Sequence, residues 1–181
     1  RETDVCAIKG LSAVAPNFFL PDYGSRITSA VYIRGIGSRI NTPAVGLYVD
    51  NVPYVDKSSY DFHFLDVDRV DILRGPQGTL YGRNTMGGLM RVFTADPFAR
   101  QGTDLSLGAS TRNGGRRASF SSFFRPADKL ALSVGAYYDG QNGFFRNVTT
   151  GRHADASDAA GGRIKVGYRP TENVRIDWNA S

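Results

Sequence analysis

Apolar and polar residues alternate along the second half of the chain. The alternation holds in five consecutive segments, at residues 104–112, 117–125, 130–139, 163–169 and 174–180. A repeat of two residues is typical of a β-strand with one apolar face. The segments approach the length of about 9–11 residues that a tilted strand needs to cross a membrane, although some are shorter. The pattern therefore predicts five strands, each with an apolar and a polar face.

The connections between these segments differ in length. Short turns are expected at residues 113–116, 126–129 and 170–173, and a long polar loop at residues 141–160. Short turns at one end and a longer loop at the other are typical of outer-membrane barrels, as are aromatic residues near the strand ends. A soluble antiparallel sheet with one face on a core shows the same alternation, so this half alone leaves both interpretations open. The aromatic residues at the strand ends are Phe124, Tyr138, Tyr168 and Trp178.

Five strands cannot close a membrane barrel, because an open sheet edge is not stable in lipid. The barrel interpretation therefore requires further strands after Ser181.

The first half of the chain mixes helix, strand and turn signals. The change of pattern divides the chain into residues 1–99 and residues 100–181. In chain order, the elements predicted for the first part are a helix at residues 4–15 ended by Pro16, a buried strand at 29–35, two short strands in 45–55 around an Asp50-Asn51 turn, and a helical turn leading into a strand at 67–73.

A glycine-rich loop follows the last of these strands. It has the sequence Leu73-Arg-Gly-Pro-Gln-Gly-Thr-Leu-Tyr-Gly-Arg-Asn-Thr-Met-Gly-Gly88. So many glycines indicate a backbone that takes positive φ angles or closely approaches another surface. The loop lacks the Gly-Lys-Ser/Thr ending of a phosphate-binding loop, and no Gly-x-Gly-x-x-Gly pattern opens a helix. No Ser-His-Asp order or paired-carboxylate pattern stands out either, so we do not expect an enzyme.

The composition says more about possible binding partners than about the fold. A hydrophobic content of 41% is a globular value, and the net charge of +5 permits contact with anionic partners. The basic residues form no run, which argues against nucleic-acid binding. The single Cys6 provides no disulfide or cysteine zinc site, and His63 and His153 lie far apart in the chain. We therefore expect no metal site and no cofactor.

Three segments of the first half carry a family resemblance. They are Val31-Tyr-Ile-Arg-Gly-Ile-Gly37, Leu47-Tyr-Val-Asp-Asn-Val-Pro53 and Asp68-Arg-Val-Asp-Ile-Leu-Arg-Gly-Pro-Gln-Gly-Thr-Leu-Tyr-Gly82. In this order and spacing they resemble the plug domain of TonB-dependent outer-membrane receptors. The resemblance implies an α+β plug domain at residues 1–99. It also implies that residues 100–181 are the N-terminal strands of a 22-stranded antiparallel transmembrane β-barrel in the bacterial outer membrane.

The function that the resemblance implies is active import of a scarce nutrient, with the plug gating the barrel. The TonB–ExbB–ExbD complex would drive uptake by pulling a TonB box, which is expected before Arg1. A ferric siderophore or other iron complex is the commonest ligand in this family, and haem, cobalamin and oligosaccharides are alternatives. Outer-membrane lipid is the remaining partner. A stand-alone plug-like binding module is the competing interpretation.

The resemblance also assigns roles to residues of the plug motifs. Arg34 and Arg74 match arginines that pair with glutamates of the barrel wall. An interior arginine needs such a partner, because an unpaired buried charge is costly. The other motif positions are Gly35, Asp50, Gly75, Pro76, Gly78, Tyr81, Gly82, Gly87 and Gly88.

Ligand contacts are expected in the outer loops of the plug. Residues 38–43 and 55–63 are its most polar and aromatic loops. Within them, side chains that would suit an anionic or hydroxyl-rich ligand are Arg39, Asn41, Tyr60 and His63. A role as ordinary solvated loop residues stays open for each of the four.

Overall fold

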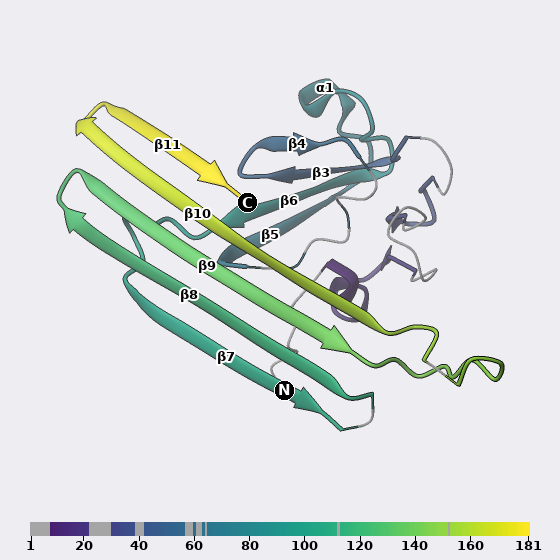
Figure 1. The fold of residues 1–181 in the computed structure, drawn as a ribbon. Helices are drawn as coiled ribbons and strands as arrows, with labels where there is room; N and C mark the ends of the chain where they lie inside the picture. The colour runs from purple at the N-terminus through teal and green to yellow at the C-terminus, as the bar shows by residue number, and fades with distance from the viewer. Residues whose placement is uncertain are drawn as a thin grey trace. The chain divides into compact units, whose positions relative to one another are not determined.

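The chain divides into two compact units, Arg1–Thr94 and Ala95–Ser181 (Figure 1). The boundary falls close to residue 100, where the sequence pattern changes. The computed structural model describes residues 8–21, 30–38, 42–56, 60, 63, 65–111, 113–151 and 153–181.

The first unit is built on a mixed four-stranded sheet with spatial order β4-β3-β6-β5. Strand β3 pairs with β6 in parallel, and the other two pairings are antiparallel. A second, two-stranded sheet joins β1 to β2. These short strands and helices confirm the predicted α+β class. The elements are the 3₁₀ helix η1 (Ile8–Ala13), β1 (Phe18–Phe19), β2 (Tyr32–Ile33), β3 (Val45–Val49), β4 (Val52–Tyr54), β5 (Val67–Arg74), the one-turn helix α1 (Gly78–Tyr81) and β6 (Gly88–Thr94).

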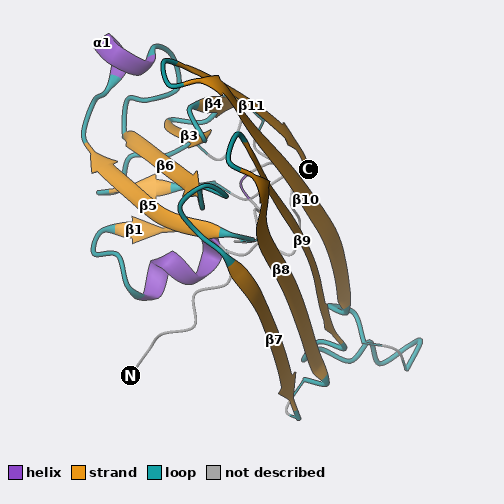
Figure 2. Cartoon of the chain, turned by 90° about the vertical axis from the view of Figure 1, so that its left-hand side faces the viewer, coloured by secondary structure: helices purple, strands orange, loops and turns teal. Residues whose placement is uncertain are grey.

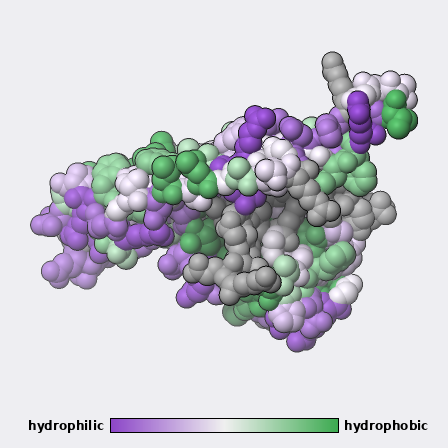
Figure 3. Space-filling view, turned by 90° about the horizontal axis from the view of Figure 1, so that it is seen from below, coloured by the Kyte–Doolittle hydropathy of each residue, from purple (hydrophilic) through white to green (hydrophobic). Residues whose placement is uncertain are grey.

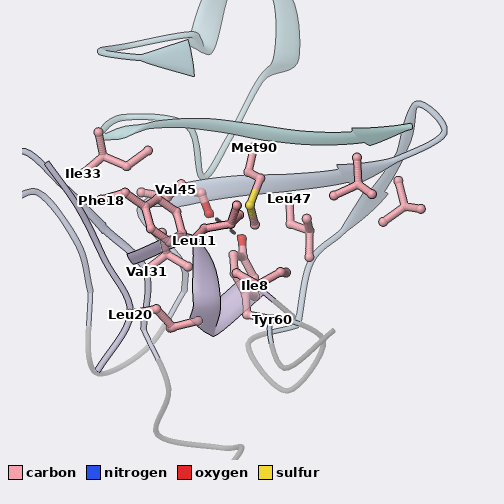
Figure 4. Packing of buried hydrophobic residues seen from close by; sticks show 12 residues of the cluster. Ile8, Leu11, Phe18, Leu20, Val31, Ile33, Val45, Leu47, Tyr60 and Met90 are labelled. Carbon is pink, nitrogen blue, oxygen red and sulfur yellow. Dashed lines mark hydrogen bonds between the residues drawn. The ribbon is translucent and has the colours of Figure 1, made fainter. Parts of the chain in front are cut away.

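One face of the four-stranded sheet contributes to the hydrophobic core of this unit (Figure 4). Helix η1, the small β1-β2 sheet with residues beside its strands, and Tyr60 supply the other side chains of the same buried cluster. Full burial of such a side chain stabilises a fold by about 1.5–3 kcal/mol, so the cluster holds these elements together. Its members include Ile8, Leu11, Phe18, Val31, Ile33, Val45, Leu47, Tyr60, Met90 and Val92.

Two predicted elements of the first unit are shorter in the structure. The helix predicted over residues 4–15 appears as η1, and residues 1–7 lie outside the described part. The strand predicted over residues 29–35 appears only as β2. Arg34 and Gly35 take φ angles of 52° and 80°, and a strand cannot continue through this region of backbone conformation. No described helix is long and apolar enough to span a membrane.

The strands around the glycine-rich loop are more regular than predicted. Residues 67–73 contain no helical turn, because β5 pairs with β6 from Val67 to Arg74. The loop itself contains helix α1, which the sequence analysis did not predict. The two strands around the Asp50-Asn51 turn are confirmed. The φ angles of 48° and 68° at these residues are of the kind that a two-residue type I′ hairpin turn requires.

The second unit is a five-stranded antiparallel sheet with spatial order β11-β10-β9-β8-β7 (Figure 2). Each strand pairs with the next one in the chain, which confirms the five predicted strands. Strand β10 starts six residues earlier than predicted. The prediction missed this part because its residues show no alternation of apolar and polar side chains. The strands are β7 (Gly102–Ser110), β8 (Gly115–Ala127), β9 (Leu130–Gln141), β10 (Ser157–Thr171) and β11 (Val174–Ala180).

The apolar face of this second sheet is the exposed one. On β10, Ile164 and Tyr168 are 43% and 44% exposed, whereas Arg163 and Lys165, which point to the other face, are each 7% exposed. Hydrophobic side chains lie open at the surface in Figure 3. A soluble sheet would bury its apolar face on a core, whereas a strand in a membrane wall turns that face outward. The pattern of exposure therefore favours the membrane interpretation.

Candidate functional site: two arginine-glycine turns and a glycine pair

The first arginine-glycine turn follows β2. The N–H of Ile33 donates to the carbonyl of Ile36 at 3.0 Å, and the N–H of Ile36 donates back to Ile33 at 2.9 Å. The N–H of Arg34 donates to the carbonyl of Asn17, which ties the turn to the residue just before β1. These bonds hold the positive φ angles of Arg34 and Gly35, and the Arg34 side chain is exposed.

The second arginine-glycine turn begins the glycine-rich loop at the end of β5. Gly75 has a φ angle of 103°, and its N–H donates to the carbonyl of Gly87 at 3.2 Å. Gln77 donates to the carbonyl of Thr85 at 3.0 Å, so both ends of the loop are tied together. Arg74 and Pro76 are exposed on either side of Gly75.

Helix α1 forms the outer part of this loop. It starts at Gly78 and ends at Tyr81, and the φ angle of 74° at the following Gly82 stops the helix. The buried hydroxyl of Thr85 donates to the carbonyl of Gly82 at 2.7 Å. Tyr81 packs edge-on against Tyr48 of β3, with ring centres 5.4 Å apart, and the Tyr48 hydroxyl donates to the Tyr81 carbonyl at 2.8 Å. The loop is therefore a folded element with fixed contacts to the sheet.

Gly87 and Gly88 bring the two arginine-glycine turns together. A Cβ on Gly87 would lie 3.0 Å from the carbonyl oxygen of Ile36, which belongs to the first turn. A Cβ on Gly88 would lie 2.5 Å from the carbonyl oxygen of Leu73, and Gly88 pairs directly with Arg74. Only glycine permits backbones to approach so closely. The sequence predicted these two glycines as motif positions, and the structure shows that they join the two turns.

Asp50 does more than form the turn between β3 and β4. Its carboxylate accepts hydrogen bonds from the N–H of Thr94 at 2.9 Å and from the Thr94 hydroxyl at 2.5 Å. Its own N–H donates to the carbonyl of Val92 at 2.9 Å. Asp50 therefore fixes the end of β6, a role that the sequence analysis did not identify because Thr94 lies 44 residues away.

The four candidate ligand contacts do not form one group in the described structure. Arg39 and Asn41 lie outside the described residues, and His63 is half-buried. Tyr60 is 2% exposed, and its hydroxyl donates to the carbonyl of Val45 inside the hydrophobic core (Figure 4). Burial raises the pKa of this hydroxyl. The position of Tyr60 supports a structural role and does not fit a direct ligand contact in this conformation.

Residues 7–89 match the sequence family described as the TonB-dependent Receptor Plug Domain. This range contains both arginine-glycine turns and the glycine pair. Residues 7–89 are a TonB-dependent receptor plug domain. TonB-dependent receptors are transporters of the outer membrane and are not enzymes. The glycine-rich loop, residues 73–88, is therefore part of the plug domain.

Similar proteins include receptors for several ligands. The pesticin receptor of Yersinia pestis is 34% identical over 114 residues, which cover 62% of this chain and 17% of that protein. The vitamin B12 transporter BtuB of Vibrio vulnificus is 27% identical over 155 residues, covering 80% of this chain and 24% of that protein.

Solved structures show the same fold along nearly the whole chain. The ferric yersiniabactin uptake receptor FyuA from Yersinia pestis superposes with a TM-score of 0.84 at 30% identity, over 94% of this chain and 27% of that chain. The ferric-catecholate import receptor Fiu from E. coli K12 has a TM-score of 0.75 at 18% identity, over 98% of this chain and 24% of that chain. The chain therefore spans about a quarter or less of the length of these TonB-dependent receptors.

Proposed function

We propose that this chain is the plug and the first wall strands of a receptor that actively imports a ferric siderophore across the outer membrane. The plug closes the barrel until ligand is bound, and the TonB–ExbB–ExbD complex then supplies the energy for its rearrangement. The observation that carries the proposal is the order of the two units. A TonB-dependent receptor plug domain is followed at once by an antiparallel sheet whose apolar face is exposed.

The assignment of residues 100–181 to a membrane wall rests on this exposed face. Strands of an outer-membrane barrel alternate lipid-facing apolar residues with residues that face the interior. The paired residues Leu105 and Phe120, and Val166 and Trp178, continue one apolar face across neighbouring strands. The small or polar residues between them, such as Ser133 and Gly135, are buried on the other face.

A ferric siderophore is the ligand that the similarities support best. The ferric yersiniabactin uptake receptor FyuA matches this chain at 30% identity over 94% of its length. The similarity to the vitamin B12 transporter BtuB is weaker, at 27% identity, and makes cobalamin the second candidate. Arg39, Asn41 and His63 stay proposed ligand contacts, because their loops carry the polar groups that an anionic chelate requires.

Arg34 and Arg74 are proposed to hold the plug in the barrel by pairing with glutamates of wall strands outside this chain. Support comes from the glycine pair, which places both turns side by side on the same part of the plug. Arg74→Ala in the full-length receptor should make the plug more sensitive to protease and raise pore conductance. Arg83→Ala, an exposed arginine of the same loop, is the matched control. Equal protease sensitivity and conductance in the two variants would refute this role.

Uptake by whole cells tests the proposed function. The full-length receptor is produced in cells that lack their own receptors for ferric yersiniabactin and cobalamin. Accumulation of iron-55 supplied as ferric yersiniabactin, and of labelled cyanocobalamin, is measured with and without an uncoupler. We expect iron-55 to accumulate and the uncoupler to abolish it. Accumulation that persists after uncoupling would refute active transport, and uptake of cyanocobalamin alone would refute the siderophore assignment.

A further inference from the structure

The segment that leads from the plug into the wall strands is fixed by a carboxylate. Asp96 accepts two hydrogen bonds from the guanidinium of Arg175 on β11, at 2.7 and 3.1 Å. It also accepts a hydrogen bond from the N–H of Phe98 at 2.9 Å. A guanidinium nitrogen of Arg169 on β10 lies 3.8 Å from a carboxylate oxygen of Asp96. Asp177 holds Arg175 in place through two further hydrogen bonds at 2.8 and 3.0 Å. Such bidentate arginine-carboxylate pairs combine strength with a fixed geometry.

The ring of Phe98 fixes the same segment at a second point. The guanidinium of Arg169 lies 4.0 Å from the ring centre, and those of Arg175 and Arg125 lie at 5.5 and 5.7 Å. Cations over an aromatic face are attracted by its electron density. Gly167 on β10 leaves the space for the ring, because a Cβ there would lie 2.7 Å from a ring carbon. Phe98 therefore contacts arginine side chains from three strands, β8, β10 and β11.

The surroundings of Asp96 keep its carboxylate charged. Partial burial acts to raise the pKa of Asp96, but the hydrogen bonds from Arg175 and the Phe98 N–H outweigh it, together with the charges of Arg175 and Arg169. The pKa of Asp96 is therefore held below its usual range, and the carboxylate stays charged at neutral pH.

The plug side of the same segment is fixed as well. Asp50 binds both the N–H and the hydroxyl of Thr94, which is the last residue of β6 and of the first unit. One residue, Ala95, separates Thr94 from Asp96. The chain is thus held on both sides of the boundary between the two units, each time by contacts inside one unit.

We propose that these contacts form a linker clamp that confines flexing between the plug and the wall strands to Ala95. The linker clamp consists of Asp50 and Thr94 on the plug side, and Asp96, Phe98, Gly167, Arg169 and Arg175 on the wall side. It keeps the C-terminal end of β6 bound to the β3-β4 turn, so that these two parts of the plug move together when the plug rearranges. This role in transport rests on the proposed function, whereas the clamp as a structural feature does not.

Hydrogen exchange in the full-length receptor, measured by mass spectrometry in detergent, tests the linker clamp without any ligand. In wild type under increasing urea, amides of residues 92–98 should open later than those of residues 32–36. Opening of residues 92–98 before or together with residues 32–36 would overturn the proposal. This outcome does not depend on uptake, so a failed uptake experiment leaves the result valid.

Two variants with matched controls test the wall side. Asp96→Asn removes the charge, and Gly167→Ala places a methyl group against the Phe98 ring. Asp96→Asn should speed exchange at residues 96–100 about tenfold or more, since a hydrogen bond to a charged group is worth at least that factor. Gly167→Ala should speed it by a similar factor, because the new methyl group displaces the Phe98 ring. The matched control for the first variant is Asp104→Asn, which removes only an exposed ion pair with Arg100. The control for the second is Gly108→Ala, whose new methyl group would lie at an ordinary contact distance of 3.6 Å from the Cβ of Arg117. Exchange rates in both controls should stay within about twofold of wild type. Equal exchange in variants and controls would overturn the clamp.

Discussion

Gly88→Ala tests the close approach that joins the two arginine-glycine turns. The new methyl group would lie 2.5 Å from the carbonyl oxygen of Leu73 and 2.8 Å from the side chain of Ile33. Leu73 is paired with Leu89 in the β5-β6 ladder, so its backbone cannot move aside without breaking the register. Overpacking of this kind costs about 1–3 kcal/mol. Gly88 also has a φ angle of 150°, and a non-glycine residue held in such a region costs about 1–3 kcal/mol more.

The two effects together predict that the variant loses roughly 2–6 kcal/mol of local stability in β6. Hydrogen exchange of peptides that cover residues 89–94 in the full-length receptor measures this loss. Since 1.4 kcal/mol corresponds to a factor of ten, exchange should speed up by at least about 30-fold. Protease sensitivity of the plug should rise with it, because the turns of Arg34 and Arg74 lose their common support.

Two other glycines of the same loop separate the causes. Gly75 has a φ angle of 103° but nothing within 4 Å of a new Cβ, so Gly75→Ala should show only the conformational cost of about 1–3 kcal/mol. Gly78 has open space around a new Cβ and is the first residue of α1, a position at which its φ angle is not in the positive region. Gly78→Ala should therefore leave β6 unchanged. Exchange in Gly88→Ala that matches Gly78→Ala would refute the close approach.

Three further predictions concern other fixed contacts. Tyr60→Phe removes the hydrogen bond to Val45 and should reduce plug stability against urea by about 0.5–1.5 kcal/mol without changing ligand affinity; weaker ligand binding at unchanged stability would mean that Tyr60 contacts ligand. Asp50→Ala should speed exchange at Thr94 more than Asp50→Asn, which keeps one acceptor for the Thr94 N–H, and equal rates would argue against the carboxylate contact. The backbone N–H groups of Phe144 and Phe145 hold the pKa of Asp155 below its usual range. Order in the 142–156 loop should therefore persist down to about pH 4 and be lost as pH falls further through the lowered pKa. A spin label on Val148→Cys should report this transition, and Asp155→Asn should leave the label mobile at every pH; a label that stays equally ordered in Asp155→Asn would contradict the prediction.

Alternation of residue types made the wall strands predictable, because each strand has one apolar and one polar face. The prediction missed the start of β10, where residues 159–162 are two alanines followed by two glycines. There the pairing with β9 defines the strand. Gly161 pairs with Tyr137, and a Cβ at Gly161 would lie 2.6 Å from the tyrosine ring. A glycine that accommodates a neighbouring ring carries no hydrophobic signal in its own segment.

Parts of the candidate site depend on residues far apart in the chain, and sequence reasoning could not identify those contacts. The arginine-glycine turns were visible as local glycine signals, but their closeness through Gly87 and Gly88 follows from the folded sheet. Tyr60 stands among polar residues in the sequence, yet it lies in the core. Asp96 pairs with Arg175, which lies 79 residues further along the chain, and no local sequence pattern indicates this pair.

We infer that this plug domain closes a pore formed by the wall strands of the complete receptor. Ion conductance of the purified full-length receptor in planar bilayers tests it most directly, compared with a variant that lacks residues 8–94. We expect the intact receptor to conduct very little and the deletion variant to form a large, stable open pore. Equal conductance of the two proteins, with both inserted as heat-modifiable barrels, would contradict a plug that gates transport.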